Sequence, residues 1–361
     1  MKLTLLNYIA CQKCGSAFEL REAAYEHGEV KQGFLACAKC NLEFPITNFI
    51  PRFAEADNYA AAFGLQWNRF SRTQIDKYNG TTLSSDRFYR ESGWSPTDLR
   101  GSMVLEAGCG AGRFTQACLD AGAEVVAFDL SNSVDACLQN HGLVQNLHII
   151  QADIYNLPFK KKLFDRAFCF GVLQHTPDPE GAFASLVPYL RPDGFVAVDV
   201  YRKVFWNWLL PKYYFRFVSR LVSYPKLFDI VSNKMVPLLL PFSDFIGRIP
   251  RIGLYLRRIL PVANIRGYAP LSEEVIRDWA VLDTFDMLAA RYDQPQTATQ
   301  IRRWFADAGL VDTVVWNRRT IVIGQGHVRS QNAVVSAPNC SKGRKCALNS
   351  PTVNIPAHNE R

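Results

Sequence analysis

A glycine-rich turn and two aspartates are the residues of this chain whose types and spacing most clearly indicate chemistry. Gly108, Gly110 and Gly112 form a G-x-G-x-G turn directly after the apolar stretch MVLEA, and Asp129 and Asp153 each follow a further apolar stretch. Glycines let a backbone approach a ligand closely. If the stretches are parallel strands, all five residues lie at the sheet edge where open α/β sheets bind ligands.

The spacing of the glycines also narrows the choice of ligand. A dinucleotide site requires G-x-G-x-x-G, but the residue three positions after Gly110 is Arg113. The missing glycine favours a cofactor without a pyrophosphate. Asp129 could accept both hydroxyls of a ribose, and Asp153, beside Ile154, could accept the exocyclic amine of an adenine. Helix N-caps and solvated turns are the structural alternative for either acid alone.

Four cysteines form a second chemical pattern. Cys11 and Cys14 form one C-x-x-C pair, Cys37 and Cys40 form another, and 22 residues separate the pairs. Two residues between thiolates let one turn present both sulfurs to a single metal, and two such turns complete a tetrahedron. Four sulfurs leave no position for water, so the pattern predicts a structural Zn²⁺; reduced or redox-active cysteines are the alternative.

Alternating strand and helix patterns must position the cofactor residues. Strands that alternate with helices at this spacing predict a parallel sheet with right-handed crossovers. The expected strands are 103–107, 124–128, 147–151, 164–170 and 195–200, with helices near 133–140 and 180–190.

These residues resemble the class I methyltransferases that use S-adenosylmethionine. VLEAGCGAGRFT at 104–115 matches the first motif, Asp129 the ribose acid and Gln-Ala-Asp at 151–153 the adenine contact. Quinone-biosynthesis enzymes and their small-molecule relatives are the most similar type. Segments that look like later motifs are 164–165, 171–179, 190–194 and 299–324.

The resemblance implies an α/β, Rossmann-like, seven-stranded methyltransferase sheet and transfer of a methyl group from the sulfonium to an acceptor. It places Glu106 and the three glycines around the methionine part of the cofactor. The complete set of expected cofactor-binding residues is Glu106, Gly108, Gly110, Gly112, Asp129, Leu130, Asp153, Ile154 and Phe170.

Two residues after later strands are candidates for acceptor chemistry. His175 follows the fourth strand and could act as a general base, or it could only orient a backbone turn. Tyr201, at the end of the fifth strand, is a weaker candidate. An Asn-Pro-Pro-Tyr motif does not follow the fourth strand, which disfavours an amino-group methyltransferase of adenine in DNA.

The segments before the first motif have likenesses of their own. Residues 1–53 resemble the small zinc-ribbon activator subunit of certain tRNA, rRNA and protein methyltransferases, here fused in cis. Phe63-Gly-Leu-Gln-Trp67 and Arg87-Phe88 resemble the segment that precedes the first motif in fused bacterial members. By that likeness, residues 54–100 form linker helices or a lid over the cofactor; plain core helices are the alternative.

A helical insertion follows the fifth strand. It occupies 202–296 and separates two parts of the methyltransferase domain, 101–201 and 297–326. Aromatic and aliphatic residues mix there with Arg and Lys, so the insertion could cap the active site or lie in a membrane headgroup layer. Acidic and aromatic residues at 283–286 and 292–295 could line an acceptor pocket or form a solvated loop.

The net charge of +8 is localised. Residues 202–268 hold 12 Lys or Arg against 2 Asp or Glu, and the tail 327–361, which we expect to be disordered, holds 5 against 1. The ribbon and the cofactor domain, taken together, are therefore mildly acidic. This distribution favours an anionic or lipid-linked acceptor, or a membrane face, over nucleic acid.

The sequence as a whole predicts S-adenosylmethionine-dependent methyl transfer to a small-molecule acceptor, such as a saccharide or a lipid-linked intermediate. The alternatives are an RNA methyltransferase that uses the ribbon for recognition and a non-catalytic scaffold that binds the cofactor. We find neither a signal peptide nor a spanning run of ~20 apolar residues. We therefore expect a cytoplasmic protein that contacts the inner face of the membrane, if at all, through 202–268.

Overall fold

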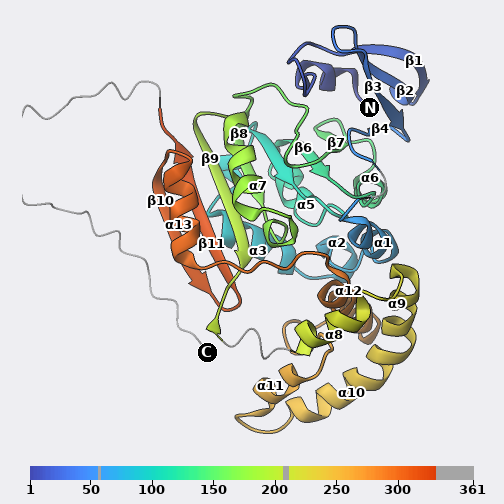
Figure 1. Cartoon of the computed structure of the whole chain (residues 1–361), viewed down its shortest axis with the longest axis vertical. Coiled ribbons are helices and arrows are strands. Elements are labelled where there is room, and N and C mark those ends of the chain that lie inside the picture. Colours follow the sequence, from blue (N-terminus) through green and yellow to red (C-terminus); the bar gives the residue numbers. More distant parts are fainter. Residues whose placement is uncertain (56–57, 206–210, 331–361) are drawn as a thin grey trace, which may run out of the picture. The chain divides into compact units, whose positions relative to one another are not determined.

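Seven strands form the central sheet of the computed structural model, which describes residues 1–55, 58–205 and 211–330. The strand order is β10-β11-β9-β8-β5-β6-β7, and the pairs from β9 to β7 are parallel while β10 and β11 are antiparallel (Figure 1). The α/β, seven-stranded sheet predicted from the sequence is confirmed. The strands are β5 (Met103–Ala107), β6 (Glu124–Asp129), β7 (Leu147–Gln151), β8 (Phe164–Cys169), β9 (Leu190–Tyr201), β10 (Leu310–Arg318) and β11 (Ile321–Val328).

The strand bounds differ from the predicted ones by more than one residue at two places. β9 begins at Leu190 because that residue already pairs with Phe164, before a register shift. β11 continues to Val328, so the first two residues of the predicted tail belong to a strand. The remaining tail residues, 331–361, lie outside the described residues.

Helices cover both faces of the sheet, and each face has its own buried core. Phe183 and Phe305 stack with their ring centroids 4.7 Å apart on one face, and Phe88 lies among Phe114 and Phe168 on the other. These helices are α5 (Thr115–Asp120), α6 (Val134–His141), η2 (Leu173–His175), α7 (Pro179–Leu186), η3 (Val187–Tyr189) and α13 (Ala298–Asp307).

The cysteine-rich segment forms a separate four-stranded antiparallel sheet. Its buried Leu5 and Phe18 belong to the same hydrophobic core as Val126 of the central sheet. Arg52 continues the contact by donating to the Asp135 carboxylate over 2.6 Å. The ribbon therefore shares its core with the cofactor domain. Its elements are η1 (Leu3–Asn7), β1 (Glu19–Glu26), β2 (Glu29–Cys37), β3 (Leu42–Thr47) and β4 (Ile50–Pro51).

Two further groups of helices complete the described part of the chain. The helices before β5 are α1 (Ala61–Arg69), α2 (Asp76–Asn79), α3 (Leu83–Ser92) and α4 (Pro96–Leu99). The insertion after β9 forms α8 (Pro211–Ser219), α9 (Tyr224–Ile230), the π-helical turn η5 (Val231–Met235), α10 (Val236–Gly247), α11 (Gly253–Leu256), η6 (Arg257–Ile259) and α12 (Glu273–Ala289).

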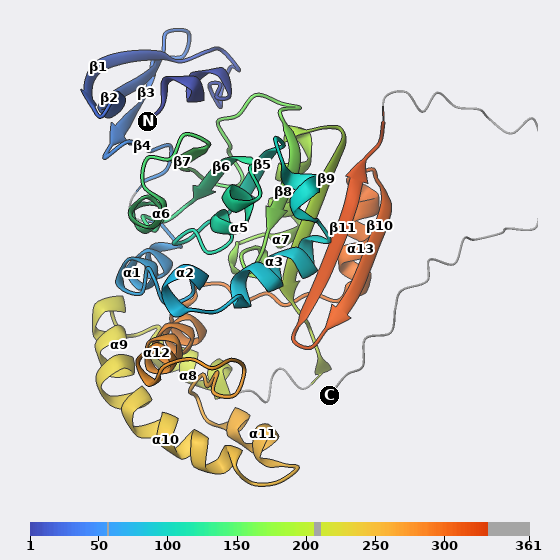
Figure 2. The same ribbon diagram turned by 180° about the vertical axis from the view of Figure 1, so that it is seen from behind.

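The insertion has a hydrophobic core of its own. Phe285 of α12 is fully buried there with Phe228 of α9 and Leu240 of α10, and Ala62 of α1 belongs to the same cluster. In Figures 1 and 2, α12 lies between the helices α1 and α2 and the outer helices α9, α10 and α11. Among the described residues, none of the helices combines the length and apolarity that a membrane crossing requires.

Candidate functional site

The glycine turn after β5 adopts a backbone that requires glycine. Gly108, Gly110 and Gly112 have φ angles of 77°, 53° and 84°, in the left-handed region. A Cβ at Gly108 would stand 2.3 Å from a methyl group of Val172. One at Gly110 would stand 3.4 Å from the indole of Trp67, so α1 contacts the turn directly.

A Gly108→Ala variant should lose both stability and cofactor affinity. Gly101 is the matched control, since its φ is 69° but a Cβ there would meet nothing within 4 Å. We expect Gly101→Ala to cost only the backbone penalty of about 1 kcal/mol. Gly108→Ala should cost more because Val172 must also move. Urea unfolding of both variants, with cofactor titration of each, measures the difference; equal effects would contradict the close packing at Gly108.

Asp129 joins the second strand to the glycine turn. One carboxylate oxygen accepts the N–H of Gly110 over 3.0 Å, and the other accepts the N–H and hydroxyl of Ser131, both over 2.8 Å. Burial raises the pKa of Asp129, and these donors oppose that rise by stabilising the charged form. Oδ1 already accepts two bonds and Oδ2 only one, so Oδ2 has room for a further hydroxyl donor.

The third strand end lies beside the second because Asp129 pairs with Gln151 across the parallel strands β6 and β7. Asp153 accepts the N–H of Tyr155 over 3.0 Å, and Ile154 is buried next to it. The backbone oxygen of Leu130 accepts from the Gln151 side chain over 2.9 Å.

Tyr59 was not predicted from the sequence but belongs to the same region. Its ring centroid lies 5.6 Å from that of Tyr292. Burial raises the pKa of Tyr59, and the neighbouring carboxylates of Asp153 and Asp129 raise it further. Its hydroxyl is therefore a hydrogen-bond donor near the two strand-end acids. An isolated tyrosine between predicted elements carried no sequence signal for this role.

Two predicted cofactor residues lie in the interior. Glu106 is buried on β5 and accepts the hydroxyl of Thr115 over 2.5 Å, and burial raises the pKa of Glu106 to about 8. The ring of Phe170 packs 5.7 Å from Phe114 and 5.3 Å from Phe168 in the hydrophobic core. Their cofactor contacts stay predictions.

His175 and Tyr201 lie together at the neighbouring strand ends. The His175 ring is buried between Phe63 and Tyr201, with centroids 5.1 and 5.4 Å away. Its Nδ1 lies 2.9 Å from the backbone oxygen of Tyr292. A carbonyl only accepts, so Nδ1 donates, which leaves Nε2 of the neutral ring as an acceptor. Burial raises the pKa of Tyr201 well above its usual value, and the nearby carboxyl of Asp286 adds to this. Tyr201 therefore keeps its hydroxyl proton and acts as a hydrogen-bond donor.

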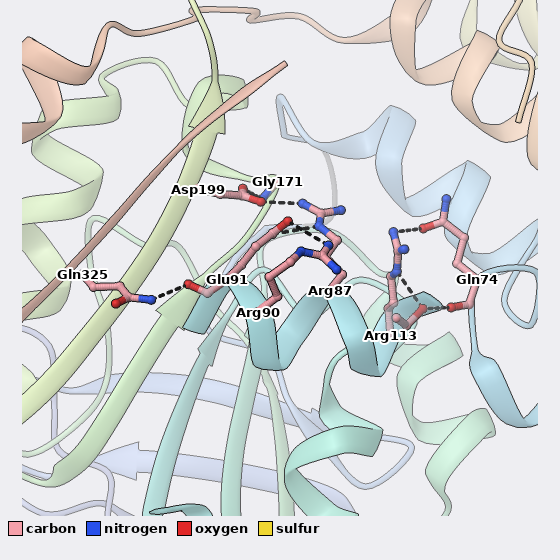
Figure 3. Close-up of polar contacts among 9 residues, drawn as sticks. Gln74, Arg87, Arg90, Glu91, Arg113, Gly171, Asp199 and Gln325 are labelled. Carbon is pink, nitrogen blue, oxygen red and sulfur yellow. Dashed lines mark hydrogen bonds and ion pairs between the residues drawn. The ribbon is translucent and has the colours of Figure 1, made fainter. Parts of the chain in front are cut away.

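A buried ion pair holds α3 against β9 beside this site. Arg87 of α3 donates to Asp199 of β9 and, over 2.9 Å, to Glu91. The other oxygen of Asp199 accepts the N–H of Gly171, in the loop that leads to His175 (Figure 3). Sequence reasoning missed this network. Its signal was Asp199, a charged residue inside the otherwise apolar strand stretch FVAVDV.

Arg113 ties the glycine turn to the segment before β5. It donates to the hydroxyl of Ser84 over 2.9 Å and to the side-chain oxygen of Gln74 over 2.7 Å (Figure 3). Burial lowers the pKa of Arg113 to about 10. The guanidinium lies over Phe114 and Trp279, so it connects the turn to α12 as well.

The acidic residues of the insertion are not in a solvated loop. Asp283 and Asp286 belong to the long helix α12, and Asp293 accepts from Lys212 and Arg216 over 2.8 and 2.6 Å. Among the described residues, the buried Oδ1 atoms of Asp286 and Asp293 have no hydrogen-bond partner. A buried carboxylate oxygen without a donor is costly, so these two atoms call for a partner that the protein atoms do not supply.

Asp283 should make stability depend on pH. Burial and the neighbouring Asp286 raise the pKa of Asp283 from 3.8 to about 7. Between about pH 4 and 7 the folded state therefore holds a proton that the unfolded state has lost, and stability falls as pH rises, by at most ~1.4 kcal/mol per unit. In urea unfolding at pH 5 and 7.5, Asp283→Asn should gain stability relative to wild type at the higher pH. The exposed Asp229→Asn control should not gain stability at the higher pH. If the stability of Asp283→Asn depends on pH as that of wild type does, the result would contradict a buried carboxyl at this position.

A groove opens next to these residues. It has a volume of about 820 Å³ and lies between the segment from Ser219 to Pro225 and the segment from Leu288 to Tyr292. Tyr292 connects it to the strand ends because its backbone oxygen accepts from His175. This volume lies in the range of small-molecule sites.

The four paired cysteines gather at one point of the ribbon. All four sulfur atoms lie within 4.8 Å of one another. A tetrahedral zinc site with bonds of about 2.3 Å has sulfur-to-sulfur edges of about 3.8 Å, so the cluster fits one such ion. Gly15 and Asn41, directly after the pairs, have φ angles of 72° and 53°, as tight turns around a metal require.

Comparison with known proteins agrees with this arrangement. Residues 105–198 match the family described as methyltransferase domain. The ubiquinone biosynthesis O-methyltransferase of Coxiella burnetii is 34% identical over 98 residues, which are 27% of this chain and 42% of that protein. That of Xylella fastidiosa is 30% identical over 127 residues, which are 34% of this chain and 52% of that protein. The chain thus spans about half or less of the curated relatives it matches.

Among solved structures, the complex that contains the Haloferax volcanii Trm112 methyltransferase activator has a TM-score of 0.41 at 11% identity, over 74% of this chain and 97% of that chain.

The matched residues, the strand order and the glycine turn together define a class I methyltransferase domain of the S-adenosylmethionine-dependent type. The class predicted from the motifs is confirmed. Within this class, the named relatives of the matched segment include enzymes of quinone biosynthesis, the type that the motifs resemble.

Proposed function

We propose that the chain transfers a methyl group from S-adenosylmethionine to a small acceptor that carries an apolar part, such as a lipid-linked intermediate or a hydrophobic saccharide derivative. The observation that carries the proposal is the meeting of the glycine turn, Asp129 and Asp153 at adjacent strand ends. The groove of about 820 Å³ is lined by none of these residues, but it reaches Tyr292, whose backbone oxygen contacts His175.

The residues present fit this cofactor. Asp129 and Asp153 are acceptors, whereas the ribose hydroxyls and the adenine amine that they would bind are donors. The glycine turn, with Trp67 over Gly110, offers a backbone cradle for the methionine part, where Glu106 and Gly108 also belong. When bound, S-adenosylmethionine supplies a methyl group that its sulfonium already activates.

The chain's own residues would align the acceptor and exclude water. Phe63 of α1 covers the His175 ring, and the insertion closes the other side through Tyr292. Nε2 of His175 is then placed to take a proton from an acceptor hydroxyl or amine. The tyrosine hydroxyl of Tyr201 would donate a hydrogen bond to the acceptor.

Replacing His175 should slow the reaction. Loss of a general base typically costs 10²- to 10⁴-fold, so we expect His175→Asn to lower kcat by about 100-fold with little change in cofactor affinity. His327→Asn, at the end of β11, is the control and should be near wild type. A His175→Asn variant with wild-type kcat would show that the histidine only orients the Tyr292 backbone.

We also propose that the cysteine cluster holds one structural Zn²⁺. The four sulfurs of Cys11, Cys14, Cys37 and Cys40 would complete its coordination, which leaves no place for a reacting water. The ribbon shares a core with β6 and β7, so the metal would support the fold of the cofactor domain.

Label transfer from methyl-labelled cofactor tests the acceptor class. Purified enzyme would be incubated with an organic-solvent extract of cells, with an aqueous small-molecule extract and with total RNA, each against the Asp129→Ala variant. We expect label in the organic extract or in hydrophobic saccharide derivatives. Label that appears only in RNA would contradict the proposal, because the proposed acceptor is a small molecule.

A further inference from the structure

We propose that the outer face of the helical insertion docks on an anionic lipid bilayer. The first observation is a stripe formed by Leu238, Phe242 and Phe245 of α10 and by Ile249 just after it, which are between 39% and 73% exposed. Their spacing of four, three and four residues places them on one side of the helix. Large apolar side chains in such a row are unusual on a free surface.

Neighbouring segments extend this pattern. Ile252, Tyr255 and Ile259, on and beside α11, are 55% to 71% exposed and again three and four residues apart. α10 packs against α11 in the outer layer of the insertion (Figures 1 and 2). A third exposed row starts on α8 and comprises Tyr214, Phe217, Val218 and Leu221.

The exposed rows are not the sides by which these helices pack into the insertion, because the opposite sides are already buried. On α10 the opposite side, with Val236 and Leu240, is already buried in the cluster around Phe285. On α8, Arg216 and Ser219 are buried through their bonds to Asp293 and the Leu288 backbone. Each helix therefore has an exposed apolar face in addition to the face that folding uses.

Exposed cations lie in the same insertion as the apolar rows and favour an anionic partner. Lys226, Lys234, Arg248, Arg251 and Arg258 are exposed, and none pairs with a carboxylate among the described residues. A helix that presents large apolar residues together with Lys and Arg can lie in the headgroup layer, with its apolar side in the acyl boundary and its cations at anionic lipids.

Other occupants fit the charge less well. A symmetric contact with a second copy would bring these cations against one another, and residues 327–361 are themselves positively charged, with 5 Lys or Arg against 1 Glu. An anionic bilayer satisfies both the apolar rows and the cations. Docking requires no methyl transfer, so this inference stands apart from the proposed function.

Vesicle co-sedimentation of the full chain tests the inference. Vesicles of phosphatidylcholine alone would be compared with a three-to-one mixture of phosphatidylcholine and phosphatidylglycerol. We expect binding to the anionic vesicles at least tenfold tighter than to the neutral ones. The variants F242S/F245S and R248E/R251E should each weaken it at least tenfold. The control Y25S/V314S removes two side chains of similar exposure, 56% and 50%, elsewhere on the surface and should bind like wild type.

Cofactor titration and thermal unfolding of each variant establish that it is folded, and the arginine variant remains informative if the phenylalanine variant is not. Equal binding to neutral and anionic vesicles, or no loss in either folded variant, would overturn the inference. A concentration-dependent dimer that F242S/F245S abolishes, without vesicle binding by wild type, would assign the face to a second copy instead.

Discussion

An Asp129→Ala variant should bind S-adenosylmethionine at least 100-fold more weakly than wild type. A hydrogen bond to a charged group contributes about 1.5 to 3 kcal/mol, and a ribose hydroxyl would lose its charged acceptor. The variant also removes the acceptor of the Gly110 and Ser131 N–H groups, so the glycine turn should loosen. Calorimetric titration of the purified variant measures the affinity directly.

Two controls separate binding from folding. Asp120→Ala removes an exposed carboxylate of α5, outside the strand edge, and should leave the affinity unchanged. Asp129→Asn keeps one oxygen acceptor but loses the charge and should lie between wild type and Asp129→Ala. Wild-type affinity in a folded Asp129→Ala protein would remove this residue from the cofactor site.

Loss of one cysteine of the cluster should have the second large effect. We expect Cys37→Ser to reduce bound zinc from one ion per chain to nearly none and to lower the thermal midpoint by about 10 °C or more. Structural zinc contributes apparent binding free energies of about 10 to 16 kcal/mol in isolated fingers, so even partial loss is large. Cys37 is buried in the core that the ribbon shares with β6 and β7, so the cofactor domain should also lose stability.

Elemental analysis and thermal unfolding measure these two effects. Cys118→Ala is the matched control, because Cys118 is a fully buried thiol of the central domain outside the cluster. It should keep its zinc and lose only modest stability. A wild-type protein that is equally stable with and without zinc would contradict a structural metal site.

The cofactor edge could be predicted because its signals are local. The glycine turn begins directly after β5, Asp129 ends β6, and Asp153 lies two residues after β7. Parallel pairing alone brings these strand ends together. The cysteine pairs are equally local, because each pair lies in one turn. The only long-range contact that had to be assumed is the one between the two pairs.

Side chains that meet across long sequence separations could not be predicted in this way. Arg87 and Asp199 are 112 residues apart, and His175 and the Tyr292 backbone are 117 apart. Their contacts depend on how α3 and the insertion pack over the strand ends. An amphipathic pattern shows that a helix is packed but does not name its partner.

The start of β9 shows a different limit. Arg191-Pro192-Asp193-Gly194 has the composition of a turn, so the strand was expected from residue 195. The structure includes these residues in the strand as an irregularity, with Asp193 at a φ of 65° and a register shift opposite Phe164. Turn composition alone does not distinguish a bulge from the end of a strand.

Calorimetric titration of the wild-type chain with S-adenosylmethionine tests the central claim most directly. The geometry at Asp129, Asp153 and the glycine turn predicts saturable binding of one molecule per chain, which S-adenosylhomocysteine displaces. The absence of saturable binding to the folded, zinc-loaded protein would contradict the cofactor site and, with it, the proposed methyl transfer.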